Sequence, residues 1–368
     1  MTNLVIQPRD PLIFRDGKDF SAGLGATSLP FATPSAVVGA LRTRLGTTDE
    51  AFVDHKIAEL LKIEFEGPYL GYRDAFTDPK TPWELAFHAP ADAVQFPKQS
   101  ISRLVPMQAW RNNCDLPGDF LSPLAFQENP PEGKPESKPA SFWTADEMAA
   151  WLGGAPPKSF EGIQPLQRQR RVQLAIKPES QTADDGMLFT TNSIEFLSNG
   201  GKIQYSLVNR FNASADDSQI PQLSHLGGEG RLAFWTQNAA VEWPSPPEIK
   251  TKGIRLILAT PAVFDHGWRP QWINAQTGEG TPPGSAETLR LRLTAVALRR
   301  PQPLSGWDYK TRKPKPTRWL APAGSVYFFE ILNHDGNDIS NLWLKSICDQ
   351  PQDRLDGFGR VLTGVLQI

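Results

Sequence analysis

The residues best suited to chemistry in this sequence are basic side chains, which crowd the segment from Arg290 to Arg318. This segment holds nine Lys and Arg residues and a single acidic residue. Trp307, Tyr309 and Trp319 are interleaved with its later part. Cations bind phosphate oxygens and aromatic rings stack on unstacked bases, so the combination is typical of surfaces that bind single-stranded nucleic acid.

A second basic cluster lies in QRQRRVQLAIK, which contains no acidic residue. A single run of charges usually marks a solvated surface. Two runs in a chain of 368 residues whose net charge is only −2 favour nucleic acid bound at local patches. The contacts predicted in the two clusters are Arg168, Arg170, Arg171, Lys177, Lys310, Arg312, Lys313, Lys315 and Arg318.

Two glycine-rich stretches each carry an arginine, and both are suited to presenting backbone N–H groups and a cation to phosphate. The residues concerned are Gly227, Gly228, Gly230 and Arg231 in HLGGEGRLAF, and Gly357, Gly359 and Arg360 in DGFGRVLTG. The second stretch does not match the spacing of a dinucleotide-binding loop and follows no βαβ unit, which argues against a nucleotide cofactor. Tight turns and a close approach between two backbones are the structural alternatives.

No other group of residues is arranged for catalysis or metal binding. The five histidines lack the spacing of a zinc site, and the two cysteines are too far apart for a CxxC motif. Asp184–Asp185 and Asp216–Asp217 lie in turn-like sequence, where aspartate commonly bonds to the local backbone. No nucleophile elbow, phosphate-binding lysine loop or kinase loop occurs. We therefore expect neither a metal nor a cofactor.

Cysteine usage and hydropathy indicate a cytoplasmic protein without membrane contact. Two unpaired cysteines fit a reducing compartment. The start MTNLVIQPRDP lacks the apolar stretch of a secretory signal, because Pro8, Arg9 and Asp10 interrupt it. No run approaches the ~20 apolar residues that cross a bilayer.

The elements that must position these residues begin with a strand at residues 4–6, a polar loop and a helix in FATPSAVVGALRTRLG. Thr33 suits the N-cap of this helix, Pro34 its first turn and Gly46 its end. Apolar residues at helical spacing predict its buried face. They are Val38, Leu41 and Leu45.

Three further elements are predicted before the middle of the chain. QENPPEGKPESKPA is a low-complexity segment and predicts a surface loop. In TADEMAAWL, Thr144 and Glu147 have the spacing of a capping box, which predicts a short helix. RVQLAIKPESQTADDGMLFTTNSIEFL has two strand-like runs around a polar turn and predicts a long projecting hairpin.

The Pro-rich stretch VEWPSPPEIKTKG predicts a boundary near residue 248 and hence two domains, 1–248 and 249–368. The second domain has a predicted helix, SNLWLKSIC, and four strand-like runs: IRLILATPAVF, LRLRLTAVALRR, SVYFFEIL and VLTGVLQI. Strands with few helices and long loops indicate an α+β fold rather than a doubly wound parallel sheet. Their spacing fits ferredoxin-like units.

Five stretches of the sequence resemble successive motifs of one family. They are IQPRDPLIFRDGKDF, PSAVVGALRTR, HLGGEGRLAFW, SGWDYKTRKPKPTRWLAPAGSVYFFE and DGFGRVLTG. Together they resemble subunit three of the Cmr complex, a RAMP-superfamily protein of the type III-B CRISPR RNA-guided effector. The matches run in order from residue 5 to residue 364. PRDPLIFRDG and PAGSVYFFE are specific, whereas the glycine-rich ending is shared widely among RAMP proteins.

The resemblance implies two ferredoxin-like (RRM-like) domains with long loop and hairpin insertions. Residues 1–248 would carry the low-complexity loop and a thumb-like hairpin, and residues 249–368 would end in the glycine-rich loop. The implied role is non-catalytic: to bind the repeat-derived 5′ tag of the CRISPR RNA. The implied partners are the large Palm-domain subunit and the first backbone RAMP subunit. Arg360 and its glycines would contact guide RNA or pack against the helix of the first domain.

Two alternatives remain beside this interpretation. A RAMP endoribonuclease would process precursor CRISPR RNA by general acid–base catalysis, which needs a histidine, tyrosine or lysine near the 2′-hydroxyl. The chain has no histidine before His55 and no tyrosine before Tyr69, which disfavours this chemistry, although Lys18 and other lysines are available. The other alternative is a protein scaffold whose basic patches meet acidic surfaces of its partners.

Overall fold

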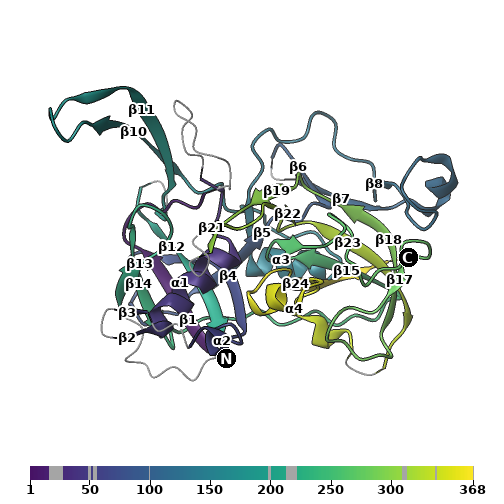
Figure 1. Ribbon diagram of the computed structural model, residues 1–368. Coiled ribbons are helices and arrows are strands. Elements are labelled where there is room, and N and C mark those ends of the chain that lie inside the picture. The colour runs from purple at the N-terminus through teal and green to yellow at the C-terminus, as the bar shows by residue number, and fades with distance from the viewer. Residues whose placement is uncertain are drawn as a thin grey trace.

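The computed structural model describes residues 1–15, 28–48, 51–52, 56–98, 100–197, 200–212, 222–308, 313–335 and 338–367. The fold is mostly β with few helices, in agreement with the predicted α+β class (Figure 1). Two antiparallel sheets form its body, one from each half of the chain.

The first sheet has seven strands in the order β13-β14-β1-β12-β4-β5-β9. Their bounds are β1 (Thr2–Pro8), β4 (Phe65–Asp74), β5 (Glu84–His88), β9 (Phe142–Thr144), β12 (Ile203–Phe211), β13 (Leu223–His225) and β14 (Leu232–Gln237). The second sheet has five strands in the order β17-β18-β23-β15-β24. Their bounds are β15 (Gly253–Leu258), β17 (Glu279–Gly280), β18 (Arg290–Ala297), β23 (Val326–Asn333) and β24 (Val361–Leu366).

Smaller strands form hairpins and three-stranded sheets around the body. They are β2 (Thr47–Thr48), β3 (Ala51–Phe52), β6 (Ala93–Phe96), β7 (Ser100–Pro106), β8 (Leu124–Phe126), β10 (Arg168–Ile176), β11 (Ala183–Ile194), β16 (Ala262–Val263), β19 (Gln302–Leu304), β20 (Trp307–Asp308), β21 (Lys313–Pro314) and β22 (Arg318–Ala321). The helices are α1 (Pro34–Gly46), α2 (Ile57–Leu60), α3 (Ala145–Leu152) and α4 (Pro351–Leu355), with 3₁₀ turns η2 (Gln108–Asn113) and η4 (Ser340–Leu342).

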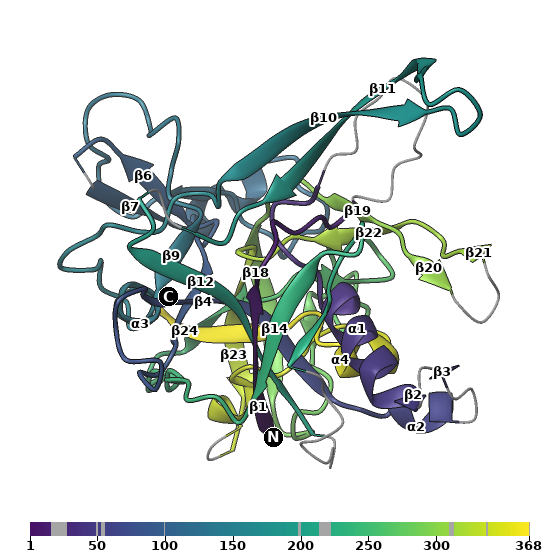
Figure 2. The same cartoon turned by 90° about the vertical axis from the view of Figure 1, so that its left-hand side faces the viewer.

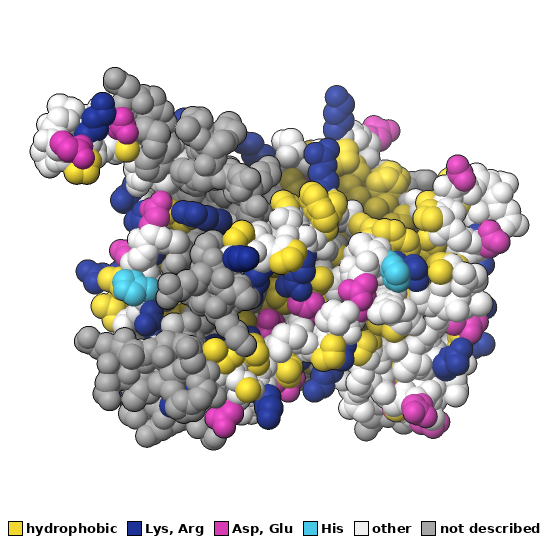
Figure 3. Space-filling model, viewed as in Figure 1, with side chains coloured by type: hydrophobic (Ala, Val, Ile, Leu, Met, Phe, Trp, Pro, Cys, Tyr) yellow, Lys and Arg dark blue, Asp and Glu magenta, His cyan; other side chains and the backbone are white. Residues whose placement is uncertain are grey.

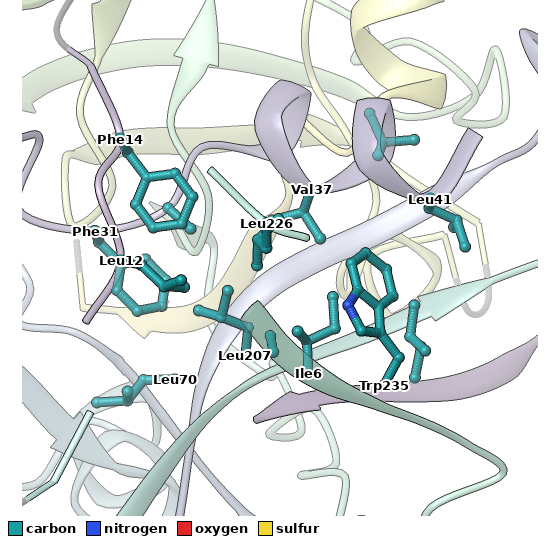
Figure 4. Close-up of a cluster of buried hydrophobic side chains, with 14 of the residues drawn as sticks. Ile6, Leu12, Phe14, Phe31, Val37, Leu41, Leu70, Leu207, Leu226 and Trp235 are labelled. Atoms are coloured by element: carbon teal, nitrogen blue, oxygen red, sulfur yellow. The ribbon is translucent and has the colours of Figure 1, made fainter. Parts of the chain in front are cut away.

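Each of the two sheets is buried on both faces. On the outer face of the first sheet, side chains such as Ile6 and Leu207 pack under Val37 and Leu41 of α1 (Figure 4). The residues between them, such as Val208, point to the opposite face because successive side chains of a strand alternate.

That opposite face packs against the second sheet. Val208 and Phe87 of the first sheet share one core with Ile257 and Phe328 of the second. The second sheet buries its other face in a separate core around Leu256 and Phe329. The two halves of the chain are therefore joined through a common hydrophobic layer.

An ion pair is buried in this common layer. Arg255 of β15 is 1% exposed, and its Nη1 donates to Oδ2 of Asp92, which is 0% exposed. Nη2 of Arg255 donates to the carbonyl of Trp151 at the end of α3, and Nε donates to the carbonyl of Val365 in β24. Trp151 Nε1 completes the group by donating to the other oxygen of Asp92 at 3.0 Å. The network ties a loop and a helix of the first half to two strands of the second.

Most of the elements predicted from sequence are confirmed. Thr144 and Glu147 form the predicted capping box at α3, and β10 and β11 form the predicted hairpin. α1 begins after Thr33 and ends at Gly46, but the hydroxyl of Thr33 makes no cap bond to the helix backbone. The predicted inward face of α1 is buried.

The predicted helix SNLWLKSIC is wrong. Only a 3₁₀ turn forms at Ser340–Leu342. The chain leaves helical geometry at Trp343, whose ψ is 122°, and Leu344 has a φ of 56°. The amide of Leu344 donates to Val361 and that of Ile347 donates to Gly359. Backbone pairing with the end of the glycine-rich loop thus replaces the helical hydrogen bonds.

The two-domain division at residue 248 stays a prediction, as does the ferredoxin-like character of each half. All seven strands of the first sheet precede residue 238, and all five of the second follow residue 252. Nevertheless, the common core and the Arg255–Asp92 pair make the two sheets one packed body.

We predict that Asp92→Asn strongly destabilises the protein, because it leaves the buried Arg255 cation without its counter-charge. Loss of one partner of a buried pair costs about 3–5 kcal/mol of unfolding free energy. Glu248→Gln is the matched control, since Glu248 pairs with Lys250 at 2.9 Å while 75% of its side chain is exposed; it is expected to cost less than about 1 kcal/mol. Denaturant unfolding measures both, and equal small losses would contradict the assignment.

Candidate nucleic-acid interface

Hairpin β10–β11 projects from the body and carries the second basic cluster, that of QRQRRVQLAIK, at its base (Figures 1 and 2). Successive residues of β10 alternate between its two faces, so Arg168 and Arg170 share a face with Val172 and Leu174. Arg171 points to the opposite face. The structure thus separates three arginines that the sequence places together.

The face that carries Arg168 and Arg170 becomes apolar toward the free end of the hairpin. Val172 is 62% exposed and Leu174 is 50% exposed, although large apolar side chains are usually buried. Figure 3 shows hydrophobic and charged side chains together at this end. A surface with cations near the body and aliphatic groups beyond them suits both a phosphate backbone and the faces of its bases.

Lys177 lies beyond β10 and is already partnered. Its Nζ is 3.7 Å from Oδ1 of Asp184, and both side chains are more than 40% exposed. An exposed pair of this kind is weak, so the cation remains accessible to phosphate.

The first glycine-rich stretch forms a turn that packs against the loop after β1. A side chain at Gly227 would meet the carbonyl oxygen of Ile13, and the amide of Gly228 donates to that same oxygen. Gly230 has a positive φ of 63°, and its carbonyl contacts Nδ1 of His225. Arg231 pairs with Glu229 at 3.0 Å, and its side chain is only 14% exposed. The stretch therefore has a structural role in which its cation is already neutralised.

The second glycine-rich stretch brings two backbones together, which confirms the close approach considered from sequence. Gly357 has φ 92°, and a Cβ there would lie 3.0 Å from the carbonyl oxygen of Gly67. A Cβ at Gly359 would meet the sulfur of Cys348 at 2.6 Å. Both glycines are needed because the loop fits against the first half of the chain and against its own neighbours.

The expected contact between Arg360 and guide RNA must be corrected for this structure. Arg360 is 2% exposed, and its Nη2 donates to the carbonyl of Phe65 at 2.8 Å and contacts Glu64 at 3.2 Å. Nη1 donates to the carbonyl of Leu344. The guanidinium is enclosed by protein groups from both halves and is not available to a phosphate.

The predicted contacts of the Arg290–Arg318 segment belong to the hairpin formed by residues 302–321. Lys310 and Arg312 are outside the described residues. Lys313 and Lys315 are exposed. Arg318 pairs with the buried Asp353 at 2.6 Å, so its charge is offset. Trp319 is an accessible aromatic side chain in this segment, with 57% of it exposed.

A pocket of about 350 Å³ lies between the two halves at the base of hairpin β10–β11. Arg168 lines it from the hairpin, and Arg299 and Arg300 line it from the segment after β18. The described residues around it include no acidic side chain. Thr33 and the start of α1 also border the pocket, and the partial positive charge at a helix N-terminus adds to the three cations.

Three rings line the same pocket. The rings of His88 and Phe142 are 4.5 Å apart, and Phe31 meets His88 edge-on at 5.5 Å. Desolvation, together with the nearby charge of Arg299, lowers the pKa of His88 to about 3. The imidazole is therefore neutral near pH 7, with one nitrogen that donates and one that accepts.

Among the residues that line this pocket, Arg168 is the one predicted from sequence as an RNA contact. Arg299 and Arg300 were counted in the basic run, and their signal was the Arg-Arg pair directly after a strand. No pattern pointed to His88, which comes from β5, far away in sequence. Arg299 also donates to the carbonyl of Ala89 at 2.8 Å, so it links the two halves beside the pocket.

The described residues offer no cluster for a metal. Within the described ranges, no three His, Cys, Asp or Glu side chains converge. Asp216–Asp217 and His55 lie outside these ranges. Among the helices that the structure describes, none is long and apolar enough to span a bilayer.

We predict that Arg360→Ala acts on stability, because it removes buried hydrogen bonds and leaves a cavity between the halves. A loss of about 2–5 kcal/mol in unfolding free energy is expected. Arg170→Ala, at an exposed position, should change stability by less than about 0.5 kcal/mol. Denaturant unfolding of the two variants checks this. A stable Arg360→Ala protein with weakened RNA binding would show instead that this side chain reaches RNA.

Three solved structures resemble this chain weakly. One chain from "Cryo-EM structure of the Type III-B Cmr-beta bound to cognate target RNA and AMPPnP, state 1" is 14% identical, with a TM-score of 0.48 over 89% of this chain and 86% of that one. A second structure of that assembly, bound to cognate target RNA, gives 15% identity with the same TM-score and coverage. A chain of the Csm3-Csm4 subcomplex in the type III-A CRISPR-Cas interference complex is 10% identical, with a TM-score of 0.39 over 92% of this chain and 96% of that one. Similarity at this level supports no conclusion about the chain.

The sequence matches no curated protein. It does match a family model. The family model described as "CRISPR-associated protein (Cas_Cmr3)" matches residues 4–366, which is nearly the whole chain. This agrees with the resemblance carried by PRDPLIFRDG and PAGSVYFFE. The chain therefore belongs to the Cas_Cmr3 family of CRISPR-associated proteins.

Proposed function

We propose that this chain is a non-catalytic subunit of a type III-B CRISPR effector complex and binds the repeat-derived 5′ tag of the CRISPR RNA. Family membership supports the assignment to the complex. The large Palm-domain subunit and the first backbone RAMP subunit are the proposed partners on the same ground. Two ferredoxin-like domains are the fold expected of such a subunit.

One observation carries the RNA-binding part of the proposal. Arg168, Arg299 and Arg300 converge on one pocket from both halves of the chain, and none has an ion-pair partner among the described residues. Elsewhere, several cations predicted to bind RNA are offset by acids, as at Arg231 and Arg318. Cations left without counter-charges on an accessible surface are those available to phosphate.

The proposed path of the RNA continues from the pocket along one face of hairpin β10–β11. Arg168 belongs both to the pocket lining and to the face that carries Arg170, Val172 and Leu174. This continuity places a second cation and then exposed aliphatic groups in line with the pocket. Arg171, on the reverse face, is outside this path.

The endoribonuclease alternative receives less support from the pocket. His88 is the histidine beside the three arginines, and its pKa of about 3 keeps it unprotonated near neutral pH. An imidazole in this state cannot serve as the general acid for a leaving oxygen and is a weak base. The chemistry of the pocket therefore favours binding over cleavage.

We predict that Arg170→Ala lowers the salt dependence of tag RNA binding, because one phosphate contact and its released counterion are lost. The slope of log affinity against log salt should fall by roughly 0.7, whatever the tag sequence. Arg171→Ala removes an equal charge from the opposite face of the same strand and should change the slope much less. Binding isotherms at several salt concentrations measure both. A larger effect from Arg171 would place the RNA on the other face.

We also predict that the purified chain cleaves neither RNA nor DNA, with EDTA or with divalent metal. The reason is that the described residues supply neither a metal cluster nor a protonated histidine in the pocket. Incubation with labelled precursor CRISPR RNA tests this. Multiple-turnover cutting that a point substitution in this chain abolishes would establish the endoribonuclease instead.

A further inference from the structure

The pocket between the halves has the size and shape for a single small ligand. Its volume of about 350 Å³ lies near the lower end of the ~300–1,000 Å³ range of ligand sites. A folded RNA element is too large for such a space, whereas one nucleotide of an extended strand fits it. The question is which parts of a nucleotide the walls can bind.

The wall formed by His88 suits a nucleobase. Neither ring nitrogen of His88 has a hydrogen-bond partner among the described residues, and the ring is neutral near pH 7. A neutral imidazole can donate to and accept from the edge of a base. Phe31 and Phe142, which are buried, pack against the imidazole ring and hold it in the pocket lining. Recognition of single-stranded RNA depends on such contacts with unstacked bases.

The arginines that line the pocket suit a phosphate. Arg300 is exposed and has no ion-pair partner among the residues described, and Arg168 reaches the pocket from the base of the hairpin. Arg299 is fixed by its bond to Ala89, so it provides charge at a set position. A base wall and a phosphate wall therefore face the same small space.

We infer that the pocket takes one unstacked nucleotide of the bound RNA, with its base against His88 and its phosphate on Arg300 and Arg168. This inference rests on the proposed binding of single-stranded RNA. His88 and Arg168 belong to the first half of the chain and Arg300 to the second, so the nucleotide bridges both. Binding is thereby linked to the docking of the two sheets, since only the docked arrangement presents both walls.

The test uses labelled RNA that carries the 5′ tag, with one change introduced at each position in turn. An abasic substitution removes a base, and a methylphosphonate removes the charge of a phosphate. In the wild type, an abasic substitution at one position should weaken binding about five- to a hundredfold. In His88→Ala the intact RNA should bind more weakly, and the same abasic substitution should have little further effect.

The phosphate is tested at the same nucleotide. Its methylphosphonate should weaken binding to the wild type but have little effect on Arg300→Ala. Arg290→Ala is the matched control: Arg290 lies at the other end of β18, pairs with Glu279 and should behave as the wild type. If His88→Ala does not fold, Arg168→Ala, an exposed change in the first half, takes its place in the phosphate test.

Two results would overturn the inference. One is that base removal weakens binding equally in the wild type and in His88→Ala. The other is that the base and phosphate effects fall on distant nucleotides. If RNA binding still depends on Arg170, either result contradicts only the inference about the pocket and not the proposed function. Absence of any binding of intact RNA to the wild type would remove both.

Discussion

The structure depends on the charge of Arg255, which is buried between the two sheets and must be satisfied entirely by protein groups. A guanidinium taken out of water loses several kcal/mol of solvation, and this loss is offset only if its donors meet well-placed acceptors. Asp92, the carbonyl of Trp151 and the carbonyl of Val365 are these acceptors. These acceptors come from a loop, a helix and an edge strand. The need of Arg255 for all three therefore fixes how these elements pack together.

A second enclosed cation has a similar effect at the glycine-rich end. Arg360 joins the carbonyls of Phe65 and Leu344, and the absence of a side chain at Gly357 lets the loop come close enough for these bonds. Nearby, Arg42 of α1 pairs with Asp356 at 2.6 Å. The cations around this loop therefore hold the halves together. This use of arginine explains why a basic sequence segment need not be a basic surface.

Three arginines without an ion-pair partner among the described residues form the proposed RNA-binding surface. Arg168, Arg299 and Arg300 lie where the two halves meet around the pocket, and their positions follow from the docking that Arg255 and Arg360 stabilise. The neutral state of His88 has the same origin. Burial in the pocket wall and the charge of Arg299 both disfavour the imidazolium, so this wall does not repel the neighbouring arginines. The packing of the halves and the proposed binding site are thus consequences of one arrangement.

The sequence by itself determined the local elements of this protein. The capping box of α3, the apolar face of α1 and the hairpin at residues 168–194 depend on residues a few positions apart, whose spacing is visible in the chain. The family also followed from short motifs spread along the sequence. These features need no knowledge of distant contacts.

Only the tertiary structure decided which cations are buried, which are paired and which stay exposed. Arg360 meets Phe65 across 295 positions, and Arg255 meets Asp92 across 163. No local pattern encodes such partners. The same reason explains the failed helix at residues 340–348, where pairing with Gly359 and Val361 prevailed over helical propensity. It also explains His88, an isolated histidine in sequence, which lines one pocket with three arginines because folding brought distant segments together.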